Sequence, residues 1–220
     1  MSRWLQWLML SLTLGLALGG VHDAAAKNKK KSQSTIRNVG IQSFDRVFKE
    51  ARTIDRKITD GQRRRRSGRQ RVTSAMNMKR KTSFSSALRE LNSRAQGKVK
   101  VATGGGRPQL RAADAVPSNV QRALGAVNTA VDDYKTLLTN LVGIPGDARR
   151  MVQRAKQLDV AQLTNEMSQL SVLNLGDRLT QVRRFRNNIQ AIGQMPKKAD
   201  RLIQGLRSDV KAVSSVFPSR

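Results

Sequence analysis

The chain has 220 residues, of which 42 are Lys or Arg and 15 are Asp or Glu, and it contains no cysteine. The lack of cysteine excludes a disulfide scaffold, a thiolate metal site and a cysteine nucleophile. Hydrophobic residues make up 38% of the chain, which is enough for one modest core.

The first 26 residues have the pattern of a secretory signal peptide. Arg3 precedes a largely apolar stretch over 4–21, and an A-x-A cleavage site follows at 24–26. We therefore expect cleavage after Ala26 and a periplasmic or secreted protein. An uncleaved membrane anchor is the alternative, since the apolar stretch can just span a bilayer. The lysines within 27–31 favour that alternative through the positive-inside rule.

Catalytic residues are scarce in the rest of the chain. Cleavage after Ala26 removes the only histidine, His22, and a chain without His or Cys has no Ser-His-Asp triad, no Cys-His pair and no ordinary zinc site. Asp132 and Asp133 are adjacent, but consecutive residues of a helix point about 100° apart, which suits neither a shared acid–base site nor a metal. We therefore expect no enzymatic activity, no metal and no cofactor.

Residues 27–107 are strongly basic and are expected to form a partly disordered arm. Residues 27–111 carry 25 basic and 5 acidic side chains, and the glycines and proline at 103–108 predict a flexible joint. The sequence RRRRSGRQR at 63–71 concentrates so much charge that we expect an exposed, mobile segment. The predicted polymer-binding residues are Arg63, Arg64, Arg65, Arg66, Arg69, Arg71, Lys79, Arg80 and Lys81.

Two helices are predicted within this basic part, because apolar residues recur at helical spacing from Phe44 to Ile58 and from Phe84 to Ala95. The first helix has a basic face opposite its apolar face. Such a helix either lies on an acidic membrane or, more commonly, packs on the rest of the protein. Its candidate contacts to membrane or polymer are Arg46, Lys49, Arg52 and Arg56. Because the few aromatic residues here belong to apolar faces, nucleic acid would be held through its phosphates without sequence preference.

The C-terminal part, 108–220, contains a duplication. At an offset of 51 residues, 134–153 aligns with 185–204, and both segments contain Pro-x-x-Ala-x-Arg, beginning at Pro145 and Pro196. Chance similarity between two amphipathic helices would reproduce the apolar spacing but not this sequence in register. We therefore predict an internal repeat. The two copies cover about 118–168 and 169–219.

Each copy is expected to be a helix, a tight turn that contains the proline, and a second helix. Apolar heptads from Val120 to Leu141 predict a long, coiled-coil-like first helix over 118–142, and short connections make neighbouring helices antiparallel. The predicted fold class is all-α, with elongated antiparallel helical hairpins forming a bundle behind the basic arm. The run VKVAT at 99–103 is the one alternating pattern that indicates a strand.

Two pairs of matching residues raise the question of a site. Tyr134 and Phe185 are expected in the core, with a ligand slot between hairpins as the alternative. Arg150 and Arg201 are expected on helix surfaces, with a paired anion clamp as the alternative.

These features predict an exported, non-enzymatic, cationic helical protein. Its expected partner is an anionic polymer, such as polysaccharide, lipopolysaccharide or nucleic acid, held non-specifically by electrostatic attraction. The hairpins would also allow a homo-oligomer. The alternative is a membrane-anchored or membrane-surface structural protein, held by the uncleaved N-terminal segment or by the basic amphipathic helix on acidic lipid.

Overall fold

The computed structural model describes residues 34–104, 107–169 and 175–217, and these are mostly helical. The predicted signal peptide lies outside the described residues. No helix within the described ranges is both long enough and apolar enough to cross a bilayer. The elements are α2 (Gln42–Ala75), α3 (Phe84–Arg94), β1 (Val99–Gly104), β2 (Arg107–Ala112), α4 (Ser118–Leu141), α5 (Ile144–Lys156), α6 (Val160–Ser168) and α7 (Leu175–Val216).

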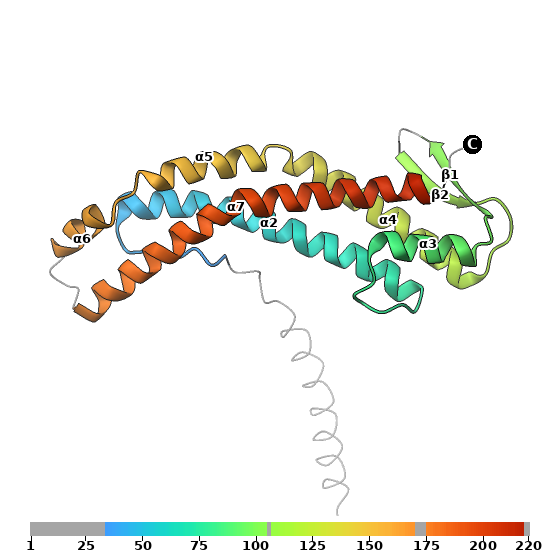
Figure 1. The fold of residues 1–220 in the computed structure, drawn as a ribbon, viewed down its shortest axis with the longest axis horizontal. Helices are drawn as coiled ribbons and strands as arrows, with labels where there is room; N and C mark the ends of the chain where they lie inside the picture. Colours follow the sequence, from blue (N-terminus) through green and yellow to red (C-terminus); the bar gives the residue numbers. More distant parts are fainter. Residues whose placement is uncertain (1–33, 105–106, 170–174, 218–220) are drawn as a thin grey trace, which may run out of the picture. The chain divides into compact units, whose positions relative to one another are not determined.

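The two longest helices, α2 and α7, lie side by side and run in the same direction (Figure 1). Near their starts the ring of Phe44 packs edge-on against Phe185, with the ring centroids 5.7 Å apart. Towards their ends Arg65 of α2 forms an ion pair with Asp209 of α7. Both contacts advance along the two helices together, which makes the pair parallel.

Helices α4 and α5 together form a rod, called the first rod below, that packs on α2 and α7. Asp133 of α4 pairs with Arg71, and Arg154 of α5 pairs with Glu50, so the rod runs antiparallel to α2. Val142 and Gly143, which join α4 to α5, keep right-handed helical dihedrals. Val142 has φ −55° and ψ −38°, and Gly143 has φ −83° and ψ −16°. For that reason α5 continues beyond α4 instead of folding back along it.

The predicted hairpin turns are therefore wrong. At Pro145 the helix is interrupted without a reversal, and at Pro196 helix α7 continues past the proline as one helix. Figure 1 shows that α7 bends partway along its length, as expected for the one proline inside it. Buried residues keep one helical face across both prolines, so the chain must keep its direction to bury them. They are Leu137, Leu141, Ile144, Ala148 and Met151 in the first rod, and Ile192, Met195, Ala199 and Leu202 in α7.

From Ser34 onwards the basic region is not a separate arm, because Ser34–Arg220 forms one compact unit. The predicted apolar face of the first basic helix is buried, including Phe44, Ala51 and Ile58. Helix α2 also continues through 63–71, where a mobile segment was expected. Close packing of this segment on the other helices outweighs the repulsion between neighbouring arginines.

Two glycines of α2 allow close contact with the other rods. A Cβ on Gly68 would lie 2.7 Å from the hydroxyl oxygen of Tyr134, and a Cβ on Gly61 would lie 2.7 Å from a methyl carbon of Leu202. Glycine inside a helix costs about 1 kcal/mol relative to alanine. The packing of Tyr134 and Leu202 onto the bare backbone offsets that cost, so these glycines hold the helix in the bundle.

Of the expected flexible joint at 103–108, residues 103–104 and 107–108 belong to two paired strands, and 105–106 lie outside the described residues. Strands β1 and β2 pair antiparallel, with Val99 opposite Ala112 and Gly104 opposite Arg107. Leu110 is buried, and its backbone N–H and C=O bond to the side-chain amide of Asn128 on α4, at 2.8 Å and 3.0 Å. The hairpin is therefore held against the first rod.

Several other predictions are confirmed. The helix predicted over 118–142 is α4, and the apolar stripe from Phe84 to Ala95 is the buried side of α3. Tyr134 and Phe185 are both core residues, 0% and 3% exposed. Sequence periodicity therefore located these helices and their buried faces correctly.

Candidate functional site

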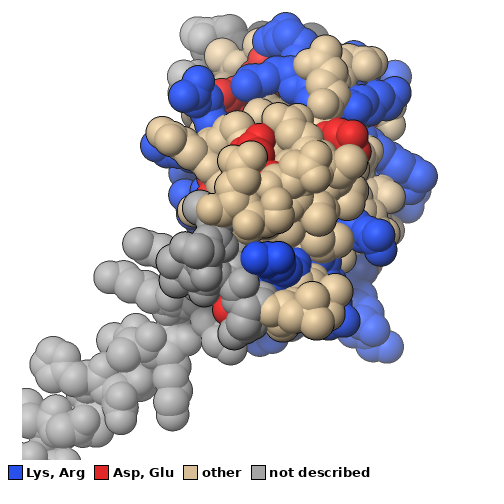
Figure 2. All heavy atoms as spheres, turned by 90° about the vertical axis from the view of Figure 1, so that its left-hand side faces the viewer, with Lys and Arg blue, Asp and Glu red and all other residues tan. Residues whose placement is uncertain are grey.

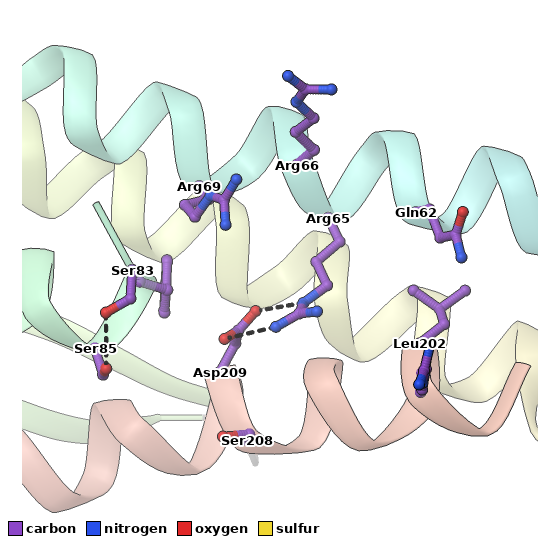
Figure 3. Close-up of a pocket in the computed structure, with 11 residues that line it drawn as sticks. Gln62, Arg65, Arg66, Arg69, Ser83, Ser85, Leu202, Ser208 and Asp209 are labelled. Atoms are coloured by element: carbon purple, nitrogen blue, oxygen red, sulfur yellow. Dashed lines mark hydrogen bonds and ion pairs between the residues drawn. The ribbon is translucent and has the colours of Figure 1, made fainter. Parts of the chain in front are cut away.

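An arginine-rich cleft of about 430 Å³ lies between α2 and α7, next to the loop that enters α3 (Figure 3). Helix α2 contributes Gln62, Arg65, Arg66 and Arg69, whose three- and four-residue spacing places them on one side of the helix. The α3 side and α7 contribute Ser83, Phe84, Ser85, Arg201, Leu202, Ser208 and Asp209.

Arg65 and Asp209 join the two walls of the cleft. The guanidinium of Arg65 donates two hydrogen bonds to the carboxylate, from Nε to Oδ2 at 2.7 Å and from Nη2 to Oδ1 at 3.2 Å. Gly205 leaves space for this pair, because a Cβ there would overlap the guanidinium. The Asp209 side chain is 13% exposed and that of Arg65 is 36% exposed, so the carboxylate is shielded from water and salt more than the guanidinium is. The geometry of the pair makes it the fixed point of the cleft.

Three further arginines line the cleft without a carboxylate partner among the described residues: Arg66, Arg69 and Arg201. The Nε of Arg69 is buried and has no hydrogen-bond acceptor within the described part of the chain. In Figure 3 Arg69 lies over the gap between the helices, whereas Arg66 extends from the outer side of α2. The cleft therefore carries a surplus of positive charge and unused N–H donors.

Serine hydroxyls add neutral donors to the same cleft. Ser83 caps α3 by accepting a hydrogen bond from the N–H of Ser86 at 3.1 Å, and its Oγ lies 3.2 Å from that of Ser85. Ser208 lies on the α7 side. Guanidinium and hydroxyl groups donate hydrogen bonds to the oxygens of carboxylate, sulfate and phosphate groups.

Tyr134 lies in the core beside the cleft and holds the backbone of α2 there. Its hydroxyl donates a hydrogen bond to the backbone carbonyl of Arg65 at 2.8 Å. Its ring packs edge-on against Phe84, with centroids 5.5 Å apart. Burial raises the pKa of the Tyr134 phenol well above its ordinary value, and the nearby Asp209 carboxylate raises it further, against a smaller opposing effect of neighbouring arginines. The phenol therefore stays a neutral donor that holds Arg65 in place.

The structure separates the other predicted polymer-binding residues from the cleft or neutralises them. Arg63 pairs with Asp60, and Arg71 pairs with Asp133. The exposed residues that remain are Arg64 on α2 and the loop residues Lys79, Arg80 and Lys81. Of the nine residues, the cleft brings together only Arg65, Arg66 and Arg69.

The second predicted set lies elsewhere on α2. Arg46, Lys49 and Arg56 are exposed, and Arg52 donates a hydrogen bond to Asn38. Since the apolar face of this part of α2 is buried in the bundle, the more common of the two interpretations of the amphipathic pattern is confirmed.

The matching arginines of the duplication do not form a clamp. Arg150 is exposed on α5 and pairs with Asp147 of its own helix, whereas Arg201 lines the cleft. Sequence reasoning missed the serines, Asp209 and the meeting of Arg201 with the α2 arginines. Only the parallel packing of α2 on α7 brings these residues together, and no local pattern signals that packing.

Charge also surrounds the end of the unit that carries α6 and the start of α7. Figure 2 shows Lys and Arg side chains around this face and mostly uncharged side chains in its centre. Leu175 and Leu179, at the start of α7, are 75% and 65% exposed.

Within the described ranges, no group of three or more His, Cys, Asp or Glu is placed to hold a metal ion.

Comparison with known proteins gives no match for this chain: no family model, no curated protein and no solved structure is significantly similar to it. The cleft between α2 and α7 is therefore interpreted from its own chemistry alone.

Proposed function

We propose that the protein binds an anionic polymer through the cleft between α2 and α7, without catalysing a reaction. The observation that carries this proposal is the group of three arginines, Arg66, Arg69 and Arg201, around the fixed Arg65–Asp209 pair. Three cations without carboxylate partners at one cleft favour a ligand that supplies several acidic groups at once.

The compartment is proposed from the sequence of residues 1–26, which has the features of a cleaved signal peptide. An exported protein meets envelope and extracellular polymers, many of which are acidic. The duplication detected in 108–220 is proposed as the origin of the long helical rods that support the cleft.

A matched pair of triple variants tests the cleft. Arg66→Ala, Arg69→Ala and Arg201→Ala together remove three charges from the cleft. The control removes three exposed charges elsewhere on α2 through Arg46→Ala, Lys49→Ala and Arg56→Ala. Binding to immobilised heparin, measured as dissociation constant against salt concentration, is expected to weaken at least tenfold for the cleft variant and to lose part of its salt dependence.

The control variant is expected to weaken binding about threefold at most, because it changes net charge but not the cleft. Equal losses in the two variants would show that binding follows net charge and would contradict the proposal. Binding that does not change between 50 mM and 500 mM salt would contradict the electrostatic mechanism itself.

The second candidate function is attachment to acidic lipid through Arg46, Lys49, Arg52 and Arg56. The favouring observation is that three of these side chains are exposed on one helix. Their helix has its apolar residues in the core, so attachment would be electrostatic, without insertion. Under this mechanism the control variant, and not the cleft variant, would lose flotation with phosphatidylserine vesicles.

A further inference from the structure

A second pocket, of about 520 Å³, lies further towards the start of α7. One wall is the segment that precedes α2, through Thr35 and Arg37, and the other wall is α7. Lining residues from α7 include the basic Arg184 and Lys198, and no carboxylate is among the residues that line this pocket. It is therefore cationic, like the cleft between α2 and α7, but it differs from that cleft in its neutral groups.

Asn188 builds this second pocket. Its buried side-chain amide accepts a hydrogen bond from the backbone N–H of Arg37 at 2.9 Å and donates one to the carbonyl of the same residue at 2.6 Å. These two hydrogen bonds resemble the pair that two residues exchange between antiparallel strands. They fix the segment at 34–41 against α7. The wall that carries Arg37 is therefore held in a defined place.

Three other amides line this pocket or its rim and are exposed: Asn187, Gln190 and Gln194. None of them bonds to another described residue. Each amide has donors and an acceptor, which matches a hydroxyl group that both donates and accepts. Phosphate, sulfate and carboxylate oxygens need only donors, so the amides indicate a ligand that also has hydroxyl groups.

One side of α7 joins the second pocket to the arginine cleft. Residues reached by alternating steps of three and four along a helix lie on the same side of it. Lys198, in the second pocket, and Arg201, in the cleft, are only one turn apart, about 5 Å along the axis. Between Asn187 and Ser208 this polar side extends over about 30 Å.

Aromatic side chains are not available for stacking on this surface. The six aromatic residues within the described ranges are at most 3% exposed. Proteins that hold single-stranded nucleic acid stack its bases on exposed rings. Amides, serine hydroxyls and cations without exposed rings favour a hydroxyl-rich acidic chain over a nucleic acid.

We infer that an acidic polysaccharide lies along this side of α7, with acidic groups in the arginine cleft and hydroxyl groups on the amides of the second pocket. This inference rests on the function proposed above and specifies its ligand class. Two sites joined by one chain bind with an affinity gain set by effective concentration, often 100-fold or more. The gain requires a chain long enough to reach both sites.

The test is a titration of the full chain with heparin oligosaccharides of increasing length, from the disaccharide upwards, followed by calorimetry. We expect weak binding of the shortest oligosaccharides and a rise of about 100-fold once the chain spans both sites. The double variant Asn187→Ala and Gln194→Ala is expected to lose most of this rise while the disaccharide affinity stays the same. Gln121→Ala, at an exposed position on α4, is the matched control and is expected to keep the rise.

The alternative outcomes separate the two proposals. Affinity that grows smoothly with charge, with no rise lost in the amide variant, would overturn the polysaccharide track but leave the arginine cleft as an anion site. Single-stranded oligo-dT of equal charge that binds as tightly as the longest oligosaccharide would overturn the ligand class. If no oligosaccharide of any length binds saturably in low salt, both proposals fail.

Discussion

Pro145 and Pro196 stand at matching positions of the proposed duplication, yet the helix differs at the two prolines. At Pro145 the α-helix is interrupted for two residues, and at Pro196 it continues as one helix with a bend. Glycines stand on both sides of the first proline, at Gly143 and Gly146, whereas α7 has one glycine near its proline, Gly193. The two flanking glycines lower the helical propensity of the first segment more, and the proline there falls at the start of a new helix.

The two segments also share a feature: in each, a stripe of buried apolar residues continues past the proline. In both rods the buried residues keep alternating three- and four-residue spacing across the proline, and neither rod reverses. If the chain reversed at the proline, the apolar residues on one side of it would be left in water. The cost in free energy is about 25 cal/mol for each Å² of apolar surface exposed. Burial along the whole rod therefore outweighs the local preference of proline for a turn.

Replacing each proline with alanine is the strongest test of this difference. Pro196→Ala restores a backbone donor inside α7 and is expected to raise the free energy of unfolding by about 1–3 kcal/mol. Pro145→Ala falls in a first helical turn, where the N–H has no partner, and should change stability by at most about 0.5 kcal/mol. Urea unfolding followed by circular dichroism measures both. Equal effects at the two sites would contradict the distinction, and a loss at Pro196 would show that the core needs the bend.

The close packing of α2 makes a second test. Gly68→Ala places a methyl group against the ring and hydroxyl of Tyr134 and is expected to destabilise the protein by about 1–3 kcal/mol, despite better helical propensity. Gly125→Ala, on α4 with open space around its Cβ position, is the control and should stabilise by about 0.5–1 kcal/mol. Stabilisation by both substitutions would mean that α2 and α4 are not in contact at Gly68.

Sequence periodicity identified α3 and α4, the buried side of the basic helix and the core positions of Tyr134 and Phe185. It failed where a local signal competes with tertiary packing. Repulsion between arginines predicted a mobile segment at 63–71, but the segment is helical and Tyr134 packs on its Gly68. The unbroken spacing of Leu141, Ile144 and Ala148 did contain the signal for a continuous rod.

The cleft was only half predictable for the same reason. Arg65, Arg66 and Arg69 belong to a conspicuous cluster, whereas Asp209 and Arg201 join them through the parallel packing of α2 on α7. A contact between residues 144 positions apart leaves no trace in local composition. Its prediction requires knowledge of which helices pack together and in which direction.

Tyr134→Phe introduces the residue found at Phe185, the position that aligns with Tyr134 at an offset of 51 residues. The phenylalanine keeps the ring packing but leaves the carbonyl of Arg65 without its hydroxyl donor, so we expect a loss of about 1 kcal/mol at neutral pH. The cleft should also bind heparin more weakly in this variant, by about two- to threefold, because Arg65 is less firmly held. An unchanged stability would show that the hydroxyl bond contributes nothing.

The same tyrosine predicts how stability depends on alkaline pH. Burial raises the pKa of Tyr134 in the folded protein, so the unfolded chain loses the phenol proton first, near pH 10. The stabilisation is complete below that pH and falls as pH rises above it. Urea unfolding between pH 9 and pH 11 should therefore show a steeper loss for the wild type than for Tyr134→Phe. Parallel curves would show that the phenol titrates alike in both states.

The smallest expected effect concerns Asp133, which aligns with the basic Arg184 at an offset of 51 residues. Asp133 pairs with Arg71 across α4 and α2, and both side chains are nearly half exposed, at 46% and 45%. Exposed ion pairs contribute about 0.2–1 kcal/mol and weaken in salt. Asp133→Ala should therefore lower the free energy of unfolding by less than about 1 kcal/mol, with the difference vanishing in 1 M NaCl. A larger or salt-independent loss would mean that this pair, and not the apolar stripe, sets the register of α4 on α2.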